Sequence, residues 1–172
     1  MLKITGAVMI LAAGTGLGMS YSMDLKRHLQ ELRQLKQLLY MLRGEIKYTR
    51  TPLPEAFCHI SERTAAPFSG FLIAVAEKIE ATDGKPFSKI WKEEAQKVLR
   101  KTHLKREERE QLEALGEVLG YLDQEMQLAS LELYAEQLEA GILDAKENIR
   151  AKQRVYQSLG IAGGVFLVIL LL

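Results

Sequence analysis

The chain has 172 residues, which fits a single domain, and 48% of them are apolar, enough to form a hydrophobic core. Its 23 Lys and Arg residues almost balance 22 Asp and Glu residues, so the net charge gives no reason to expect nucleic acid or an acidic substrate as a partner. Only 4 prolines interrupt a composition rich in helix formers, and the single cysteine, Cys58, excludes an internal disulfide.

Both ends of the chain are long uncharged segments. Residues 4–22 contain no charged side chain and would extend about 28 Å as a helix, close to the hydrocarbon thickness of a bilayer. Residues 155–172 are also uncharged and end in an aliphatic run. We therefore predict an N-terminal transmembrane segment at 1–22 and a C-terminal one at 155–172. A cleaved signal peptide, with Lys3 as its basic start, is the alternative for the first segment.

Small residues recur at a spacing of four in both predicted spans. Gly14 and Gly18 lie in the first span, and Gly160 and Gly164 lie in the second. This spacing lets helix backbones approach closely, so these glycines are candidates for packing between membrane helices. The frequent use of Gly in membrane helices explains the pattern equally well.

Two spans would place both chain ends on one side of a membrane and residues 23–154 on the other. The far side carries Lys3 and the terminal amine. Basic residues close to the spans are more numerous on the central side: Lys26, Arg27, Arg33, Lys36, Lys146, Arg150, Lys152 and Arg154. The positive-inside rule therefore predicts that residues 23–154 form a cytoplasmic domain.

The first part of this domain reads as a long helix followed by a corner. A helix from about 24 to 50 is predicted by apolar residues at spacings of three and four: Leu25, Leu29, Leu32, Leu35, Leu39, Leu42 and Ile46. Pro52 and Pro54 end it, because the residue before each proline is pushed out of the helical region. Pro54 also fits the first turn of a second helix, which we expect to run to about Arg63.

Four further helices are expected. The third is marked by apolar residues from Phe71 to Ile79 and ends at 82–84, the fourth starts at Pro86 with Trp91 as the anchor of the core, and the fifth starts near Arg106. Gly116 and Gly120 permit either close packing or an end of the fifth helix at Gly120. The sixth starts near Leu122 and continues into the second span, with one predicted buried face: Met126, Ala129, Leu133, Leu138, Ile142, Ala145 and Ile149. The predicted fold is all-α, a six-helix bundle flanked by an N-terminal and a C-terminal transmembrane helix.

The sequence offers no recognisable catalytic, cofactor or metal site. The three histidines, His28, His59 and His103, lack the spacing typical of zinc or copper ligands. The glycines of residues 14–18 lie in a predicted membrane helix rather than at a phosphate-binding turn. The basic run at 100–106 fits an ordinary turn, or a contact with anionic lipid or with an acidic protein surface. We therefore expect a non-enzymatic protein.

Four stretches carry a resemblance that covers nearly the whole chain. They are the Gly-rich N-terminal segment, the corner 51–56 (TPLPEA), the stretch 115–120 (LGEVLG) followed by Asp123 and Gln127, and the end at 160–172. In these residues the chain resembles the stage III sporulation AB proteins of endospore-forming bacteria. That family is in turn similar to the helical cytoplasmic domain of the inner-membrane platform proteins of type II secretion and type IV pilus machines.

The resemblance implies a component of the channel between mother cell and forespore. It places this protein in the mother-cell membrane facing the forespore, with its central domain in the mother-cell cytoplasm. The implied partners are a secretion-type ATPase, stage III sporulation protein AA, and other channel membrane proteins. The secretion platforms have two such domains and three spans, so a homo-oligomer would make up the difference. Candidate contacts for the ATPase are the acidic residues Glu117, Asp123 and Glu125, which are otherwise simply solvated.

Two other classes of function compete with this hypothesis. One is a membrane-anchored signalling adaptor that relays to a cytoplasmic partner, for which a folded domain on the far side of the membrane would be the supporting feature. The other is an enzyme, for which a deep polar pocket with converging ionisable groups would be the sign.

Overall fold

The computed structural model describes the side chains of residues 23–152 and 155, apart from residues 50, 82–83 and 121–122. Except for the exposed Val155, the predicted spans 1–22 and 155–172 therefore lie outside the described residues, together with Gly14, Gly18, Gly160 and Gly164. Within the residues that are described, no helix has both the length and the apolar composition that crossing a bilayer requires.

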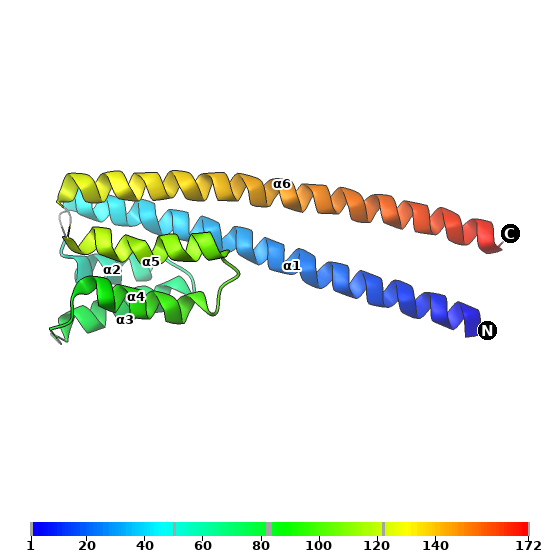
Figure 1. Cartoon of the computed structure of the whole chain (residues 1–172), viewed down its shortest axis with the longest axis horizontal. Helices are drawn as coiled ribbons and strands as arrows, with labels where there is room; N and C mark the ends of the chain where they lie inside the picture. The colour runs from blue at the N-terminus through cyan, green and yellow to red at the C-terminus, as the bar shows by residue number, and fades with distance from the viewer. Residues whose placement is uncertain (1, 50, 82–83, 122, 172) are drawn as a thin grey trace.

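In the described part of the chain, all regular structure is helical (Figure 1). The elements are α1 (Leu2–Gly44), the π-helical turn η1 (Glu45–Thr49), α2 (Leu53–Ser61), α3 (Phe68–Glu80), α4 (Phe87–Leu99), α5 (Arg106–Tyr121) and α6 (Gln124–Leu171). The prediction of an all-α protein with six helices is confirmed. The boundaries 22/23 and 154/155 that we drew between membrane and central segments fall inside α1 and α6, so no break in the backbone marks them.

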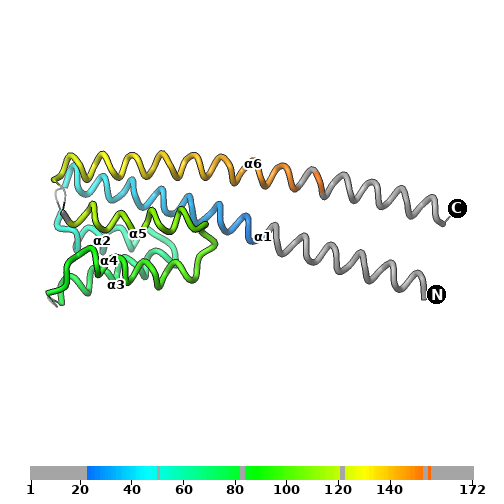
Figure 2. The backbone as a smooth tube through the Cα atoms, in the orientation of Figure 1, coloured from blue at the N-terminus to red at the C-terminus, as the bar shows by residue number. Residues whose placement is uncertain are grey.

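The long helices α1 and α6 lie side by side, and the four short helices pack along them as two hairpins (Figure 1). α2 packs against α3, α4 packs against α5, and α3 joins the two hairpins by packing against α4. Past the short helices, the coloured parts of α1 and α6 in Figure 2 both project at the same end of the bundle. We call this the stalk end, and the opposite end, where η1 and the start of α6 lie, the remote end.

The core is formed by one face of each helix. All seven residues of the stripe predicted on the first helix, the last of which, Ile46, lies in η1, are buried except Leu25, which is half-buried. On α4, Ile90, Trp91, Ala95, Val98 and Leu99 are buried. The apolar spacing that predicted these helices therefore also identified their inner faces.

The face predicted for α6 was wrong at its start and confirmed from Leu138 onward. Met126, Ala129 and Leu133 are exposed, and Leu131, Tyr134 and Ala135 are buried there instead, whereas Leu138, Ile142 and Ala145 are buried as predicted. The spacing contains the reason: the step from Leu133 to Leu138 is five residues, which places Leu138 about 140° around the helix from Leu133. The continuous face runs through Leu131 and Leu138 to Ile142 and Ala145.

Candidate functional site

The three acidic residues proposed to contact a partner lie where α5 meets α6, at the remote end of the bundle. Glu117 is exposed on α5, and Asp123 and Glu125 are exposed at the start of α6. The side-chain amide of Gln124 donates to the backbone oxygen of Ile46 at 2.7 Å, which ties this end of α6 to the buried residue of η1. The three carboxylates therefore stand on a fixed part of the surface.

Asp123 also has a structural role that we did not predict. Its Oδ1 accepts a hydrogen bond from the Met126 backbone amide at 2.9 Å, which is the contact made by a helix N-cap. The Gln127 side-chain amide donates to the Leu119 backbone oxygen at 2.9 Å and so crosses from α6 back to α5. The sequence contained the signal for the cap, an Asp directly before a helical run.

The proline corner joins η1 to α2 at the same end. Pro52 precedes the helix, its backbone oxygen accepts from the Ala56 amide at 2.9 Å, and Pro54 lies in the first turn of α2. Thr49 and Thr51 both donate to the carboxylate of Glu45. The hydrogen bond from Thr49, with that from Thr51, outweighs burial and holds the pKa of Glu45 below its ordinary value.

Trp91 is completely buried at the centre of the short helices. Its indole nitrogen donates to the Leu112 backbone oxygen at 2.7 Å, and its ring lies 4.8 Å from the ring of Phe71 and 5.7 Å from that of Phe57. Gly116 is next to the indole on α5, which continues past Gly120 to Tyr121. The glycine at 116 is where α4 and α5 approach most closely around the tryptophan.

A buried hydrogen-bonded pair holds α5 against α1 near the stalk end. His28 Nε2 lies 2.8 Å from Glu108 Oε2, and their side chains are 6% and 12% exposed. The same Glu108 oxygen accepts from the Lys105 backbone amide at 2.6 Å, and Tyr134 on α6 donates to the Glu108 backbone oxygen at 3.2 Å. Burial alone would raise the pKa of Glu108, but the hydrogen bonds from His28 and Lys105 outweigh burial and hold it below the ordinary value.

A second buried carboxylate fixes the loop between α4 and α5 to the same helix. Glu31 accepts from the His103 backbone amide at 2.6 Å and lies 3.1 Å from His103 Nδ1. His103 Nε2 lies 3.6 Å from Asp24 Oδ1, and Leu104 is 1% exposed in the core. Sequence reasoning missed both pairs, because the residues that they join are 72 to 80 positions apart.

The described surface has a groove but no cluster of metal-binding side chains. No group of three or more His, Cys, Asp or Glu side chains in this part of the chain could hold a metal ion. One open groove of about 550 Å³ lies between α1 and α6, with lining residues that include Arg33, Lys36, Tyr40 and Glu139. Lys36 and Glu139 pair with each other across it. Arg33 and Lys146 also line the groove, so it carries more basic than acidic side chains.

The comparisons with known proteins agree with one another. Over residues 3–172 the chain matches the family model described as Stage III sporulation protein AB. It is 32% identical over 173 residues to Stage III sporulation protein AB of Bacillus subtilis (strain 168), and the match covers 100% of both chains. A solved structure of Stage III sporulation protein AB (SpoIIIAB) is similar with a TM-score of 0.66 and 30% identity, covering 72% of this chain and 97% of that chain. The chain belongs to the stage III sporulation protein AB family.

Proposed function

We propose that this protein is a non-enzymatic membrane platform in the channel between mother cell and forespore. In this proposal the ends of the chain anchor it in the mother-cell membrane, with the bundle in the mother-cell cytoplasm. The bundle docks a secretion-type ATPase, stage III sporulation protein AA, and the spans contact other membrane proteins of the channel. Membership in a sporulation family supports the cellular setting. The lengths of the uncharged end segments support the anchoring.

The observation that carries the proposal is that the two ends of the bundle differ. α1 and α6 project from the stalk end, and the exposed Glu117, Asp123 and Glu125 lie at the remote end. If both ends of the chain enter a membrane, the remote end is the part of the bundle farthest from it. A large cytoplasmic ATPase reaches that end without colliding with the bilayer.

The rigid connection between the two ends supports a platform as well. Helix α6 joins the carboxylates at its start to its contacts with α1, through Lys36 and Glu139, and with α5, through Tyr134 and the Glu108 backbone. A load applied at the remote end is therefore transmitted along two packed helices instead of being absorbed by loops.

The test is binding of the purified ATPase to the full chain in lipid nanodiscs, measured by calorimetry at two salt concentrations. We expect saturable binding that weakens at high salt, because charged docking faces are screened. The variant Glu117→Gln/Glu125→Gln is expected to bind several-fold more weakly and with less salt dependence. The control Glu136→Gln/Glu147→Gln removes two exposed charges from α6 outside the docking face and should bind as the wild type does.

Two results would contradict the docking proposal. One is absence of binding when the nanodisc-bound chain is folded and the ATPase is active. The other is an equal loss of affinity in both double variants, which would mean that the overall charge rather than the remote end attracts the ATPase. The first result would favour a scaffold whose partners are other membrane proteins, and light scattering of the detergent-solubilised chain would then test whether it forms a homo-oligomer.

A further inference from the structure

The loop between α4 and α5 is the most basic segment of the described surface. Residues 100–106 (RKTHLKR) contain four basic and no acidic residues. Arg100, Lys101, Lys105 and Arg106 are all exposed. We call residues 100–106 the basic loop.

The basic loop is held in one position against α1. Its His103 backbone amide donates to Glu31, and its Leu104 side chain is buried in the core. Thr102 Oγ1 donates to the Leu99 backbone oxygen at 2.9 Å, and Arg109 Nε donates to the Leu104 backbone oxygen at 2.7 Å. These contacts fix the inner side of the loop, so its basic side chains face away from the core.

This position corresponds to a definite depth if residues 1–22 span a bilayer. The partners of the loop on α1 are Asp24 and Glu31, which follow the last uncharged residue, Ser22, by two and nine positions. At 1.5 Å per residue they lie about 3 and 14 Å beyond the end of the span. The headgroup layer on each side of the hydrocarbon is about 5–8 Å thick. The Asp24 contact is therefore at the level of the lipid headgroups and the Glu31 contact is about 6 Å beyond them, so the loop borders the headgroup layer and its long basic side chains can reach it.

The charges at this level have few partners within the chain. Lys26 and Arg27 on α1 are exposed beside the loop, and in the described part of the chain neither they nor Arg100 and Lys101 form an ion pair. Arg106 pairs with Glu110, and Lys105 contributes to the field at Glu108. Three of the nearby acidic side chains contact histidines: Asp24 and Glu31 contact His103, and Glu108 contacts His28. Glu107 is exposed.

We propose that the basic loop, together with Lys26 and Arg27, binds the anionic phospholipid headgroups of the membrane that the chain itself enters. This inference rests on the proposed membrane anchoring, but not on the docking of an ATPase. Each basic side chain near an anionic surface strengthens its attraction about fivefold, so four to six of them hold the stalk end of the bundle against the bilayer. The contact orients the bundle and keeps its remote end pointing into the cytoplasm.

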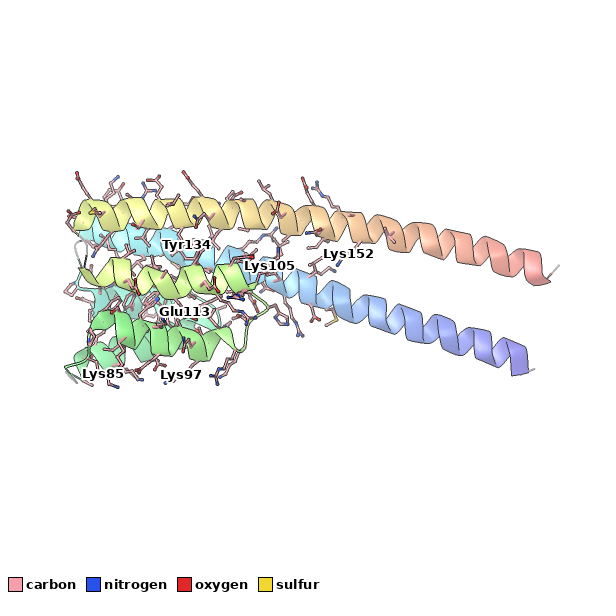
Figure 3. All side chains as sticks on the ribbon, in the orientation of Figure 1. Lys85, Lys97, Lys105, Glu113, Tyr134 and Lys152 are labelled. Atoms are coloured by element: carbon pink, nitrogen blue, oxygen red, sulfur yellow. The ribbon has the colours of Figure 1, made fainter. Side chains whose placement is uncertain are left out.

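The first experiment measures the depth of the basic loop relative to the bilayer. In a Cys58→Ser background, the full chain is spin-labelled at Lys105→Cys, at Lys85→Cys or at Ala13→Cys and reconstituted in bilayers with 30% anionic lipid. Lys105 and Lys85 lie at opposite ends of the bundle (Figure 3). We expect nickel chelated to lipid headgroups to relax the label at 105 and not the label at 85, and oxygen dissolved in the bilayer to relax the label at 13.

The second experiment measures how lipid binding by the chain depends on charge. Spin-labelled phosphatidylglycerol is compared with spin-labelled phosphatidylcholine for association with the unlabelled full chain. We expect a preference for the anionic lipid that falls about twofold or more in Arg100→Gln/Lys101→Gln and at high salt. The control is Lys89→Gln/Lys92→Gln, two exposed lysines on the remote half of α4, and it should keep the wild-type preference.

The outcomes distinguish a failure of the membrane anchoring from a failure of the loop contact with lipid. A label at 13 that meets no lipid overturns the anchoring and the loop contact together. A label at 13 in the bilayer with a label at 105 that does not meet the headgroups overturns the loop contact alone. If Arg100→Gln/Lys101→Gln keeps its lipid preference but loses binding to the ATPase, the loop is a protein-docking surface, and the lipid proposal is wrong.

Discussion

Gly116 lies so close to Trp91 that a Cβ atom added to the glycine would be 2.4 Å from Cδ1 of the indole and 2.8 Å from its Cβ. Real Cβ atoms do not approach other atoms this closely, and the indole cannot turn away, because its nitrogen is bonded to the Leu112 backbone oxygen. Gly116→Ala is therefore expected to destabilise the fold by about 1–3 kcal/mol, more than the helix propensity of Ala returns. Urea unfolding of the full chain in detergent, followed by circular dichroism, measures the change.

Gly70→Ala is the matched control for this prediction. Gly70 lies in α3 with nothing within 4 Å of its added Cβ. There the substitution should stabilise the protein by about 0.5–1 kcal/mol, since Ala loses less conformational entropy than Gly in a helix. Equal effects at both positions would mean that the indole does not limit the approach of α4 to α5.

Asp123 should contribute to stability through its hydrogen bond to the Met126 amide. Asp123→Ala is expected to cost about 1 kcal/mol, whereas Asp123→Asn, which keeps a capping oxygen, should cost only a few tenths. The same denaturation assay measures both. Because Asp123→Asn removes the charge and keeps the cap, it also tests docking of the ATPase without a loss of folding. Equal destabilisation by Ala and Asn would show that the charge of Asp123, rather than its cap, stabilises the helix.

The buried pair of His28 and Glu108 predicts a dependence of stability on pH. The pKa of Glu108 is lowered in the folded protein, so its contribution is fully present above the unfolded pKa of about 4.3 and is lost as the pH falls through the lower folded pKa. At pH 7, Glu108→Gln should cost about 1–3 kcal/mol, because charge-assisted hydrogen bonds are lost. The difference between wild type and variant should shrink as the pH falls below the unfolded pKa of about 4.3, as measured by thermal unfolding. A difference that does not change with pH would exclude Glu108 as the titrating group.

Glu31 should control the order of the loop at 100–105. It accepts from both the backbone amide and the ring of His103. Glu31→Ala leaves that amide without its acceptor, so we expect amide hydrogen exchange in the loop to rise by tenfold or more while exchange in α2 and α3 stays unchanged. The exposed neighbour Gln30 provides the control, since Gln30→Ala should leave exchange in the loop as it is. Uniform faster exchange would instead indicate global destabilisation.

Local sequence signals were enough to locate the helices. Pro52, Pro54 and Pro86 precede or occupy the first turns of α2 and α4, and apolar spacing identified the buried side of α1. The first helix was predicted to end near Arg50, but its α-helical part ends at Gly44 and η1 continues it. A proline restricts the conformation of the residue before it, but it does not determine the pitch of the preceding helical turn.

The contacts that position the surfaces depend on tertiary structure and could not be predicted in the same way. His28 and Glu108 are 80 residues apart, and a single sequence contains no signal that pairs them. The exposed side of α6 at Met126 and Leu133 was missed because two apolar patterns overlap in its first turns, and only packing against α1 decides between them. The acidic residues were identified by type, whereas their common location at one end of the bundle required the fold.

The pairing of α1 with α6 also has a consequence for synthesis on the ribosome. Lys36 contacts Glu139, and 103 residues separate them in the chain. At elongation rates of about 5–20 residues per second, the first helix waits roughly 5–20 s for its main packing partner to be made. During that interval the leucines of α1 are partly uncovered, and such exposed apolar surface favours aggregation of a nascent chain. The last helix to be translated is the one that completes the domain.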